Sequence, residues 1–434
     1  MIRETLTAFG FMAVAATAGP LPSPEASFPP PDMSEISLGR LLFYDPILSG
    51  SGTVSCATCH HPRFATSDGV SLGLGDGGIA LGPNRKHDPD NVPEKRIPRN
   101  APALFNLGAE EFTTFFHDGR LETAPERPSG IRTPLGREME QGFDSALAAQ
   151  AMFPVLSGDE MAGHYSENEV AQAVRRGVLT GKGGAWDLLA KRVAEIPEYR
   201  DGFALVNGPD APITFADIAN AIAAFIAFEW RADNSPFDHY LRDAAPLPAD
   251  AMAGLELFYG KAGCDACHSG LFQTDHGFHA IAMPQIGPGK AARFESHSRD
   301  TGRMRVTGAP EDAYRFRTPS LRNIVHTGPY GHAGAYAKLD AVIRHHLDPV
   351  ASLLNYDPKM AVLPGDRFPD DFRIYADLKE LEAIAKANDL APMQLSDLEI
   401  ADIVAFLNAL NDEGALKGRL GIPETVPSGL PVDQ

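Results

Sequence analysis

The sequence CATCH at residues 56–60 and the sequence CDACH at residues 264–268 decide how this chain folds. Each reads C-x-x-C-H, which is the attachment signature of a c-type haem. Two thiols three positions apart can add to the two vinyl groups of one porphyrin, and the histidine that follows can then bind the iron. The two motifs therefore predict two covalent haem c groups, held by Cys56, Cys59, His60, Cys264, Cys267 and His268.

Other sites also use cysteine pairs at this spacing, namely zinc sites, structural disulfides and thioredoxin-like redox pairs. None of these sites asks for a histidine directly after each pair. All four cysteines of the chain belong to the two motifs. Haem attachment is therefore the interpretation that accounts for every cysteine.

The composition limits the partners of the chain. With 434 residues it is long enough for two or three domains with a sizeable core. Its formal net charge of −19 argues against nucleic acid as a partner. The 41 glycines and 36 prolines predict long structured loops between helices.

The N-terminus resembles a secretory signal peptide. Residues 6–18 are apolar, too short a run for an uncleaved anchor, and end in the A-x-A cleavage pattern. Covalent haem is normally attached outside the bacterial cytoplasm, so both features predict a periplasmic protein. No later stretch reads as a membrane span, because the most apolar one, residues 215–230, contains Asp217 and Glu229 and suits a buried helix.

Apolar spacing predicts a mainly α fold with long loops. A short helix precedes each C-x-x-C-H motif, and this shared order suggests two cytochrome-c-like haem domains of one ancestry. The expected helices are at 37–44, 145–153, 168–179, 185–195, 214–231, 249–261, 339–347 and 397–410. The expected organisation is a signal peptide (1–18), a Pro-rich extended segment (19–34), an N-terminal haem domain (35–235) and a C-terminal haem domain (236–425).

Four ordered motifs carry a family resemblance. They are LGRLLFYDPILSGSGTVSCATCH at 38–60, RNAPALFN at 99–106, HDGR at 117–120 and FRTPSLRNIVHTGPYGHAG at 316–334. With them, nearly all of the mature chain resembles bacterial di-haem cytochrome c peroxidases and their MauG-type relatives. The resemblance implies hydrogen peroxide as substrate, a small periplasmic cytochrome or copper protein as electron donor, and a possible homodimer.

The resemblance also implies a peroxidatic first haem with His60 as its proximal ligand. Its distal glutamate and glutamine, ten residues apart in the family, match Glu160 and Gln150. Glu138 is a competing match, but the spacing favours Glu160. A carboxyl group there can take a proton from one peroxide oxygen and return it to the other.

A loop histidine closes this iron in many family members, in a pattern like SxGH. Here the stretch at 71–74 reads SLGL, so Leu74 stands at the histidine position and cannot bind iron. We therefore expect an open sixth position at the first haem. His87, further along the loop, is the alternative ligand.

The second haem has His268 as its predicted proximal ligand. The distal ligand of the family, methionine or tyrosine, matches His346 here. Helical phase supports this match, because residues 339, 342, 343 and 346 share one face and His345 lies about 100° away. We expect bis-histidine ligation, which makes the second haem a stronger reductant than methionine ligation would. Met283 and Met304 are the alternative ligands.

Two further positions follow from the resemblance. His117 replaces the tryptophan that lies between the haems in the family, so Phe115, Phe116 or the porphyrin edges would carry the electron, and His117 could equally be a hydrogen-bonded core residue. The family's calcium ligands match Asn100, Thr327 and Pro329.

Three functions fit this sequence. The favoured one is a di-haem peroxidase that reduces hydrogen peroxide to water. The second is a MauG-type oxidase that modifies residues of a partner protein. The third is an electron-transfer protein with two haems and no catalysis.

Overall fold

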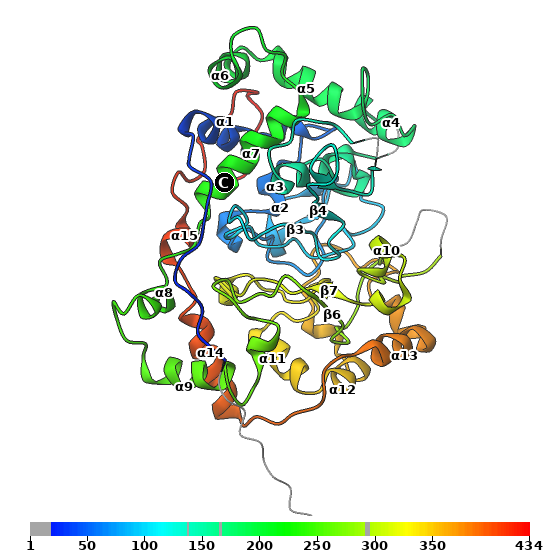
Figure 1. Ribbon diagram of the computed structural model, residues 1–434. Coiled ribbons are helices and arrows are strands. Elements are labelled where there is room, and N and C mark those ends of the chain that lie inside the picture. Colours follow the sequence, from blue (N-terminus) through cyan, green and yellow to red (C-terminus); the bar gives the residue numbers. More distant parts are fainter. Residues whose placement is uncertain (1–18, 137–138, 165–166, 291–295) are drawn as a thin grey trace, which may run out of the picture.

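The computed structural model describes residues 19–136, 139–164, 167–290 and 296–434 (Figure 1). The predicted signal peptide and the competing Glu138 lie outside these residues. The described chain is rich in helices, as predicted, and each strand is only two or three residues long.

The α-helices are α1 (Met33–Tyr44), α2 (Cys56–Cys59), α3 (Ala146–Gln150), α4 (Glu169–Arg175), α5 (Ala185–Glu195), α6 (Pro197–Asn207), α7 (Phe215–Glu229), α8 (Pro236–Leu241), α9 (Ala249–Phe258), α10 (Met304–Thr307), α11 (Leu339–Leu347), α12 (Pro349–Leu354), α13 (Leu378–Ala387), α14 (Asp397–Asn408) and α15 (Glu413–Lys417). None of the described helices combines the length and the apolar character that crossing a bilayer requires.

Three small antiparallel sheets lie in the loops between the helices. They pair β1 (Gly78–Ile79) with β2 (Lys86–His87), β4 (Leu121–Thr123) with both β3 (Thr114–Phe115) and β5 (Ile131–Arg132), and β6 (Phe278–His279) with β7 (Phe316–Arg317). These sheets hold long loops in place without building a layer of their own.

The buried apolar side chains form two large clusters. The helices that surround them lie in the upper and the lower half of Figure 1. The first surrounds α1, α5 and α7 and contains Phe43, Trp186 and Trp230. The second surrounds α9 and α14 and contains Phe258 and Phe406. Each cluster underlies one of the two C-x-x-C-H motifs.

A close helix crossing precedes each motif. Helix α1 packs against α7, and α9 packs against α14. Gly39 lies on the Ala221 carbonyl and Gly254 lies on the Asp402 carbonyl, so a Cβ at either glycine would overlap backbone atoms. The order of a short helix and then a C-x-x-C-H motif, noted in the sequence, thus has the same packing in both halves.

Capping residues fix the ends of two of the long helices. Thr214 and Asp217 form a capping box at the start of α7. Ser396 and Glu399 form the predicted capping box of α14. These contacts satisfy N–H groups that have no partner inside the helix.

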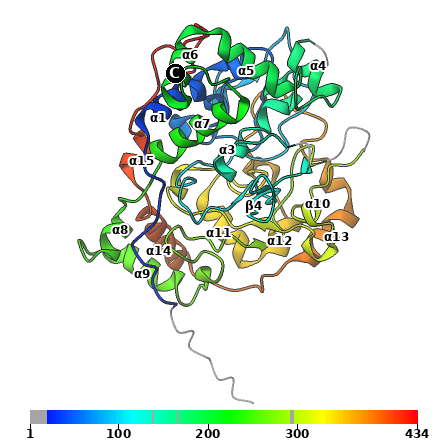
Figure 2. The same ribbon diagram turned by 45° about the horizontal axis from the view of Figure 1, so that its top comes forward.

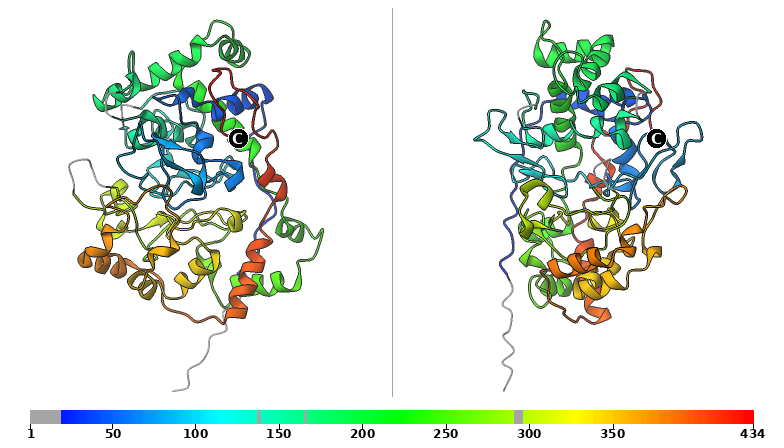
Figure 3. Two further views of the ribbon diagram at one scale, coloured as in Figure 1. Left: turned by 180° about the vertical axis from the view of Figure 1, so that it is seen from behind. Right: turned by 90° about the vertical axis from the view of Figure 1, so that its right-hand side faces the viewer.

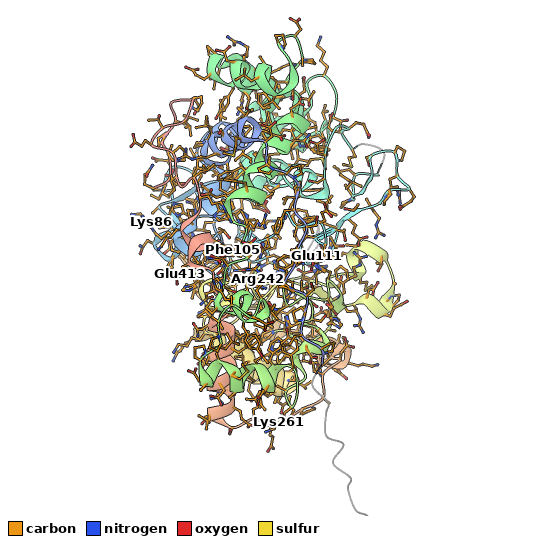
Figure 4. All side chains as sticks on the ribbon, turned by 60° about the vertical axis from the view of Figure 1, so that its left-hand side comes forward. Lys86, Phe105, Glu111, Arg242, Lys261 and Glu413 are labelled. Atoms are coloured by element: carbon orange, nitrogen blue, oxygen red, sulfur yellow. The ribbon has the colours of Figure 1, made fainter. Side chains whose placement is uncertain are left out.

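Both ends of the described chain cross from one half to the other, as Figures 2 and 3 show. Near the N-terminus, the Gly19 N–H donates to the Tyr259 carbonyl in the second half. Near the C-terminus, Ala415 and Val426 belong to the first core although α14 belongs to the second. The halves also meet at Glu111, labelled in Figure 4, whose Oε1 lies 3.1 Å from Nε2 of His276.

Candidate haem sites and active site

The first motif forms α2, a single turn that places both of its thiols on one side of the chain. His60 follows directly, and its Nδ1 lies 3.0 Å from the Thr66 carbonyl. Since a carbonyl only accepts, Nδ1 donates, and the ring presents Nε2 as its unprotonated nitrogen. Burial lowers the pKa of His60 and so favours the neutral ring that binds a metal.

The second motif repeats this arrangement. Cys264 begins the short η7 turn (Cys264–Ala266), and Nδ1 of His268 lies 3.0 Å from the Gln273 carbonyl. Burial lowers the pKa of His268 to about 4, and nearby His346 contributes. All four thiols are free. Two thiols and an oriented neutral imidazole at each motif fit covalent haem c.

Helix α11 contains two adjacent histidines with different contacts. Nδ1 of His346 lies 2.7 Å from the Val342 carbonyl, so this ring too presents Nε2. His345 uses both nitrogens, because Nδ1 lies 3.1 Å from the Tyr336 hydroxyl and Nε2 lies 2.8 Å from the Ile281 carbonyl. His346 also interacts electrostatically with His268. The contacts therefore leave His346, and not His345, free to bind an iron held by His268.

The two candidate methionines lie elsewhere in the second half. Met283 packs beside Gly331 and lines a small internal cavity with Phe316 and His332. Met304 is the first residue of α10. The choice of His346 over these methionines stays a prediction.

Glu160 lies in η6 (Gly158–Ala162), a single turn of π-helix. Its backbone carbonyl accepts the N–H of Asp76 at 2.9 Å, and Gly75 packs directly against its backbone. The carboxyl group is near enough to the first motif to add to the rise in the pKa of Cys59, which burial takes to about 12. The charge of Glu160 thus acts on the first motif, and its role as the distal residue stays a prediction.

The surroundings of Glu160 set its proton affinity. Burial raises the pKa of its carboxyl group, while the positive charges of Lys290 and Arg120 lower it. Arg120 comes from the HDGR motif, and its guanidinium lies 3.6 Å from the centre of the Phe116 ring. Lys290 comes from the other half of the molecule, in a long loop without a sequence pattern, so nothing in the sequence indicated it.

Gln150 ends α3 and is half-buried. Among the described residues, no hydrogen bond joins its side chain to Glu160. Its pairing with Glu160 therefore stays a prediction.

The loop that replaces the closing histidine is packed into the protein. Leu74 is fully buried, and its carbonyl accepts a hydrogen bond from Arg85. Nδ1 of His87 lies 3.7 Å from an Asp366 carboxylate oxygen, and its ring lies 5.0 Å from that of Phe368. His87 thus contacts a loop of the second half.

A buried ionic network lies at the junction of the two halves. Arg99 donates two hydrogen bonds to Asp300, at 2.7 and 2.8 Å, and lies 2.7 Å from Asp118. Nε2 of His117 lies 3.0 Å from the Asn100 carbonyl, and burial lowers the pKa of His117 to about 4. His117 is therefore a half-buried, hydrogen-bonded residue with a lowered pKa, which is compatible with the structural alternative that the sequence left open.

Asn100, one of the three predicted calcium ligands, contacts the segment that contains the other two. The Asn100 amide nitrogen donates to the carbonyls of Val70 and Ser71, and its backbone N–H donates to the His332 carbonyl. Thr327 and Pro329 lie just before His332 in the chain. Calcium binding stays a prediction.

Comparisons with known proteins find relatives of two kinds. A family model described as "Di-haem cytochrome c peroxidase" matches residues 33–245. The chain is 30% identical over 398 residues to "Methylamine utilization protein MauG" of Methylorubrum extorquens, covering 91% of this chain and 82% of that protein. It is 31% identical over 309 residues to "Cytochrome c551 peroxidase" of Pseudomonas aeruginosa, covering 70% and 69%.

Solved structures share the fold. A MauG-like protein associated with microbial copper homeostasis matches with a TM-score of 0.58 and 26% identity, over 94% of this chain and 97% of that one. The diheme peroxidase BthA from Burkholderia thailandensis matches with a TM-score of 0.60 over 96% and 97% of the chains, and at 20% identity it shows the fold alone.

Proposed function

Because this chain belongs to the di-haem cytochrome c peroxidase family, we propose that it reduces hydrogen peroxide to water at the first of two haem c groups. The observation that carries the proposal is the half-buried Glu160, whose carboxyl group has a pKa raised by burial and whose charge acts on Cys59 of the first motif. His60 would hold the first iron, and His268 with His346 would hold the second. When bound, haem supplies the iron that binds peroxide and exchanges electrons.

Glu160 supplies the proton chemistry of this proposal. Its carboxylate takes the proton from the peroxide oxygen nearer the iron and returns it to the departing oxygen, which leaves as water. Burial strengthens the carboxylate as a base, since it raises its pKa. Lys290 and Arg120 keep the group from staying protonated. The proposed role of Gln150 is to orient the peroxide beside this carboxyl group.

The second haem would supply the entry point for electrons. His268 and His346, each a neutral imidazole oriented by a backbone carbonyl, would hold its iron and leave no position for peroxide. The proposed donor is a small periplasmic cytochrome or copper protein. The signal-like N-terminus and the haem motifs support a periplasmic location.

The test of this function is a stoichiometry. The holoprotein, mixed with reduced c-type cytochrome, should oxidise two molecules of that cytochrome for each hydrogen peroxide. A MauG-type oxidase, favoured by the 30% identity to a protein of that name, would instead keep its oxidised state after peroxide until a partner protein is added. If the holoprotein does not react with peroxide, electron transfer without catalysis remains as its function.

The acid limb of the pH profile of kcat/KM, where activity falls at low pH, should reflect the protonation of Glu160. Turnover requires the carboxylate, so activity should be lost as the pH falls through a pKa above the usual value of 4.5. Lys290→Met removes a positive charge that lowers this pKa, and should move the limb of kcat/KM upward by roughly half a pH unit to one unit. Lys182→Met, at an exposed lysine of the first half, is the control and should leave the limb in place. A limb that stays put in both variants would contradict the role of Lys290.

A further inference from the structure

An open groove lies beside the helix that contains His346. Helices α11 and α12 and the short η10 turn (Pro358–Met360) form its walls, in the lower half of Figure 1. Its volume of about 700 Å³ is that of a site for a small organic molecule. The lining residues include Tyr336, Ala337, Lys338, Asp340, Ala341, Arg344, His345, Tyr356, Lys359 and Met360. Neither His346 nor His268 is among the lining residues, so the groove is distinct from the proposed haem site.

The floor of the groove holds a fixed pair of rings. The Tyr336 hydroxyl lies 3.1 Å from Nδ1 of His345, and Nε2 of His345 lies 2.8 Å from the Ile281 carbonyl. The carbonyl can only accept, so Nε2 carries the proton and Nδ1 accepts from Tyr336. Both side chains are almost fully buried, and this pair therefore has one defined orientation.

These rings connect the groove to the proposed ligand of the second haem. The ring centres of His346 and His345 are 5.9 Å apart, and those of His345 and Tyr336 are 5.3 Å apart. Tyr356 continues the series at 5.7 Å from Tyr336. The four rings thus form a continuous series from Tyr356 to His346.

The rim of the groove is basic. Lys338, Arg344 and Lys359 line it with a single acidic residue, Asp340. Arg344 is paired with Asp397, which leaves the two lysines as the main positive charges. In a chain with a net charge of −19, such a rim favours an anionic occupant. The aromatic floor and the alanine walls favour a flat ring.

We propose that this groove binds a small phenolic carboxylate as a one-electron donor, and that Tyr336 and His345 conduct its electron to His346. The proposal rests on the proposed peroxidase function for the oxidant. Two phenols and one hydrogen peroxide give two phenoxyl radicals and two waters. Each phenol loses one electron through the rings and one proton to solvent, and two protons are taken up where the peroxide is reduced. No bond of the protein is made or broken.

The experiment uses the resting holoprotein and ferulate, a phenol with a carboxylate. Calorimetry should show one saturable site. Lys338→Glu combined with Lys359→Glu should raise the Kd about tenfold or more, because two attractive charges become repulsive. Ala337→Trp, at an exposed position of the wall, should abolish binding by filling the groove. Lys182→Glu makes one such substitution in the other half, which is half of that change of charge, and should leave the Kd unchanged.

A second measurement follows peroxide-dependent oxidation of ferulate. The KM for ferulate should rise in the groove variants, while turnover with reduced c-type cytochrome stays as in the parent protein. Coniferyl alcohol, the neutral counterpart of ferulate, should show no effect of the two lysine substitutions.

Absence of saturable binding, or equal Kd values in the groove variants and the Lys182→Glu control, would overturn the proposed site. Binding that is lost in these variants while ferulate oxidation continues unchanged would overturn the electron path. Specific binding by a protein that consumes no peroxide would refute the peroxidase function and leave the binding site standing.

Discussion

Replacing Glu160 with glutamine should lower the rate of peroxide turnover by about 10²- to 10⁴-fold, the range that a positioned acid–base group contributes. The amide has nearly the shape of the carboxyl group but cannot accept the peroxide proton. Glu160 makes no capping contact and lies at a half-buried position, so the fold and both haem spectra should be retained. Steady-state assays at saturating electron donor measure the effect.

Glu195→Gln is the matched control, because Glu195 is exposed at the end of α5. It should retain full activity. Full activity in the Glu160 variant as well would show that another group moves the proton, and Glu138 would be the next residue to test.

Replacing His346 with methionine should raise the reduction potential of the second haem, since a thioether ligand favours ferrous iron more than imidazole does. Haem reduction potentials vary over roughly 0.8 V with the axial ligand, so the change in potential from a single ligand exchange should be easy to measure by titration. The low-spin spectrum should change from a bis-imidazole to an imidazole–thioether type. Spectroelectrochemical titration of both proteins measures the two changes.

His345→Gln is the control for this exchange. Glutamine can keep a hydrogen bond to Tyr336 or to the Ile281 carbonyl, and it leaves His346 in place. The potential and the spectrum of the second haem should then stay close to those of the parent protein. A bis-imidazole spectrum that survives in His346→Met and is lost in His345→Gln would assign the ligand to His345.

Local patterns predicted much of the helical structure. The predicted helix at 339–347 has the observed bounds of α11, and the predicted capping box starts α14. Helices α6, α8, α12 and α13 were missed. Gly202 interrupts the apolar pattern of α6, whereas α13 is clearly amphipathic, with Leu381 and Ile384 buried, so its period was present in the sequence and was overlooked.

Contacts between distant parts of the chain could not be read from the sequence. Arg99 and Asp300 are 201 residues apart, and only the folded chain brings them to 2.7 Å. The packing of the C-terminal segment on the first core is likewise a contact between distant parts of the chain. Such contacts follow from the tertiary arrangement and leave no period or spacing in the sequence.

In the candidate site too, some features could be predicted from the sequence and others needed the structure. The C-x-x-C-H spacing was enough to indicate both haem motifs, and helical phase was enough to prefer His346 over His345. The positions of Lys290 and Arg120 around Glu160 needed the structure, because the three residues come from separate loops and turns. The hydrogen bonds that fix the ring of His345 also needed it.

The two irons are expected to differ, with one open to peroxide and the other bound by two imidazoles. An electron paramagnetic resonance spectrum of the fully oxidised holoprotein distinguishes them. It should show one high-spin ferric haem and one low-spin haem with two imidazole ligands. Two low-spin signals would contradict this expectation, because a side chain, with His87 as the first candidate, would then occupy the iron of the first haem.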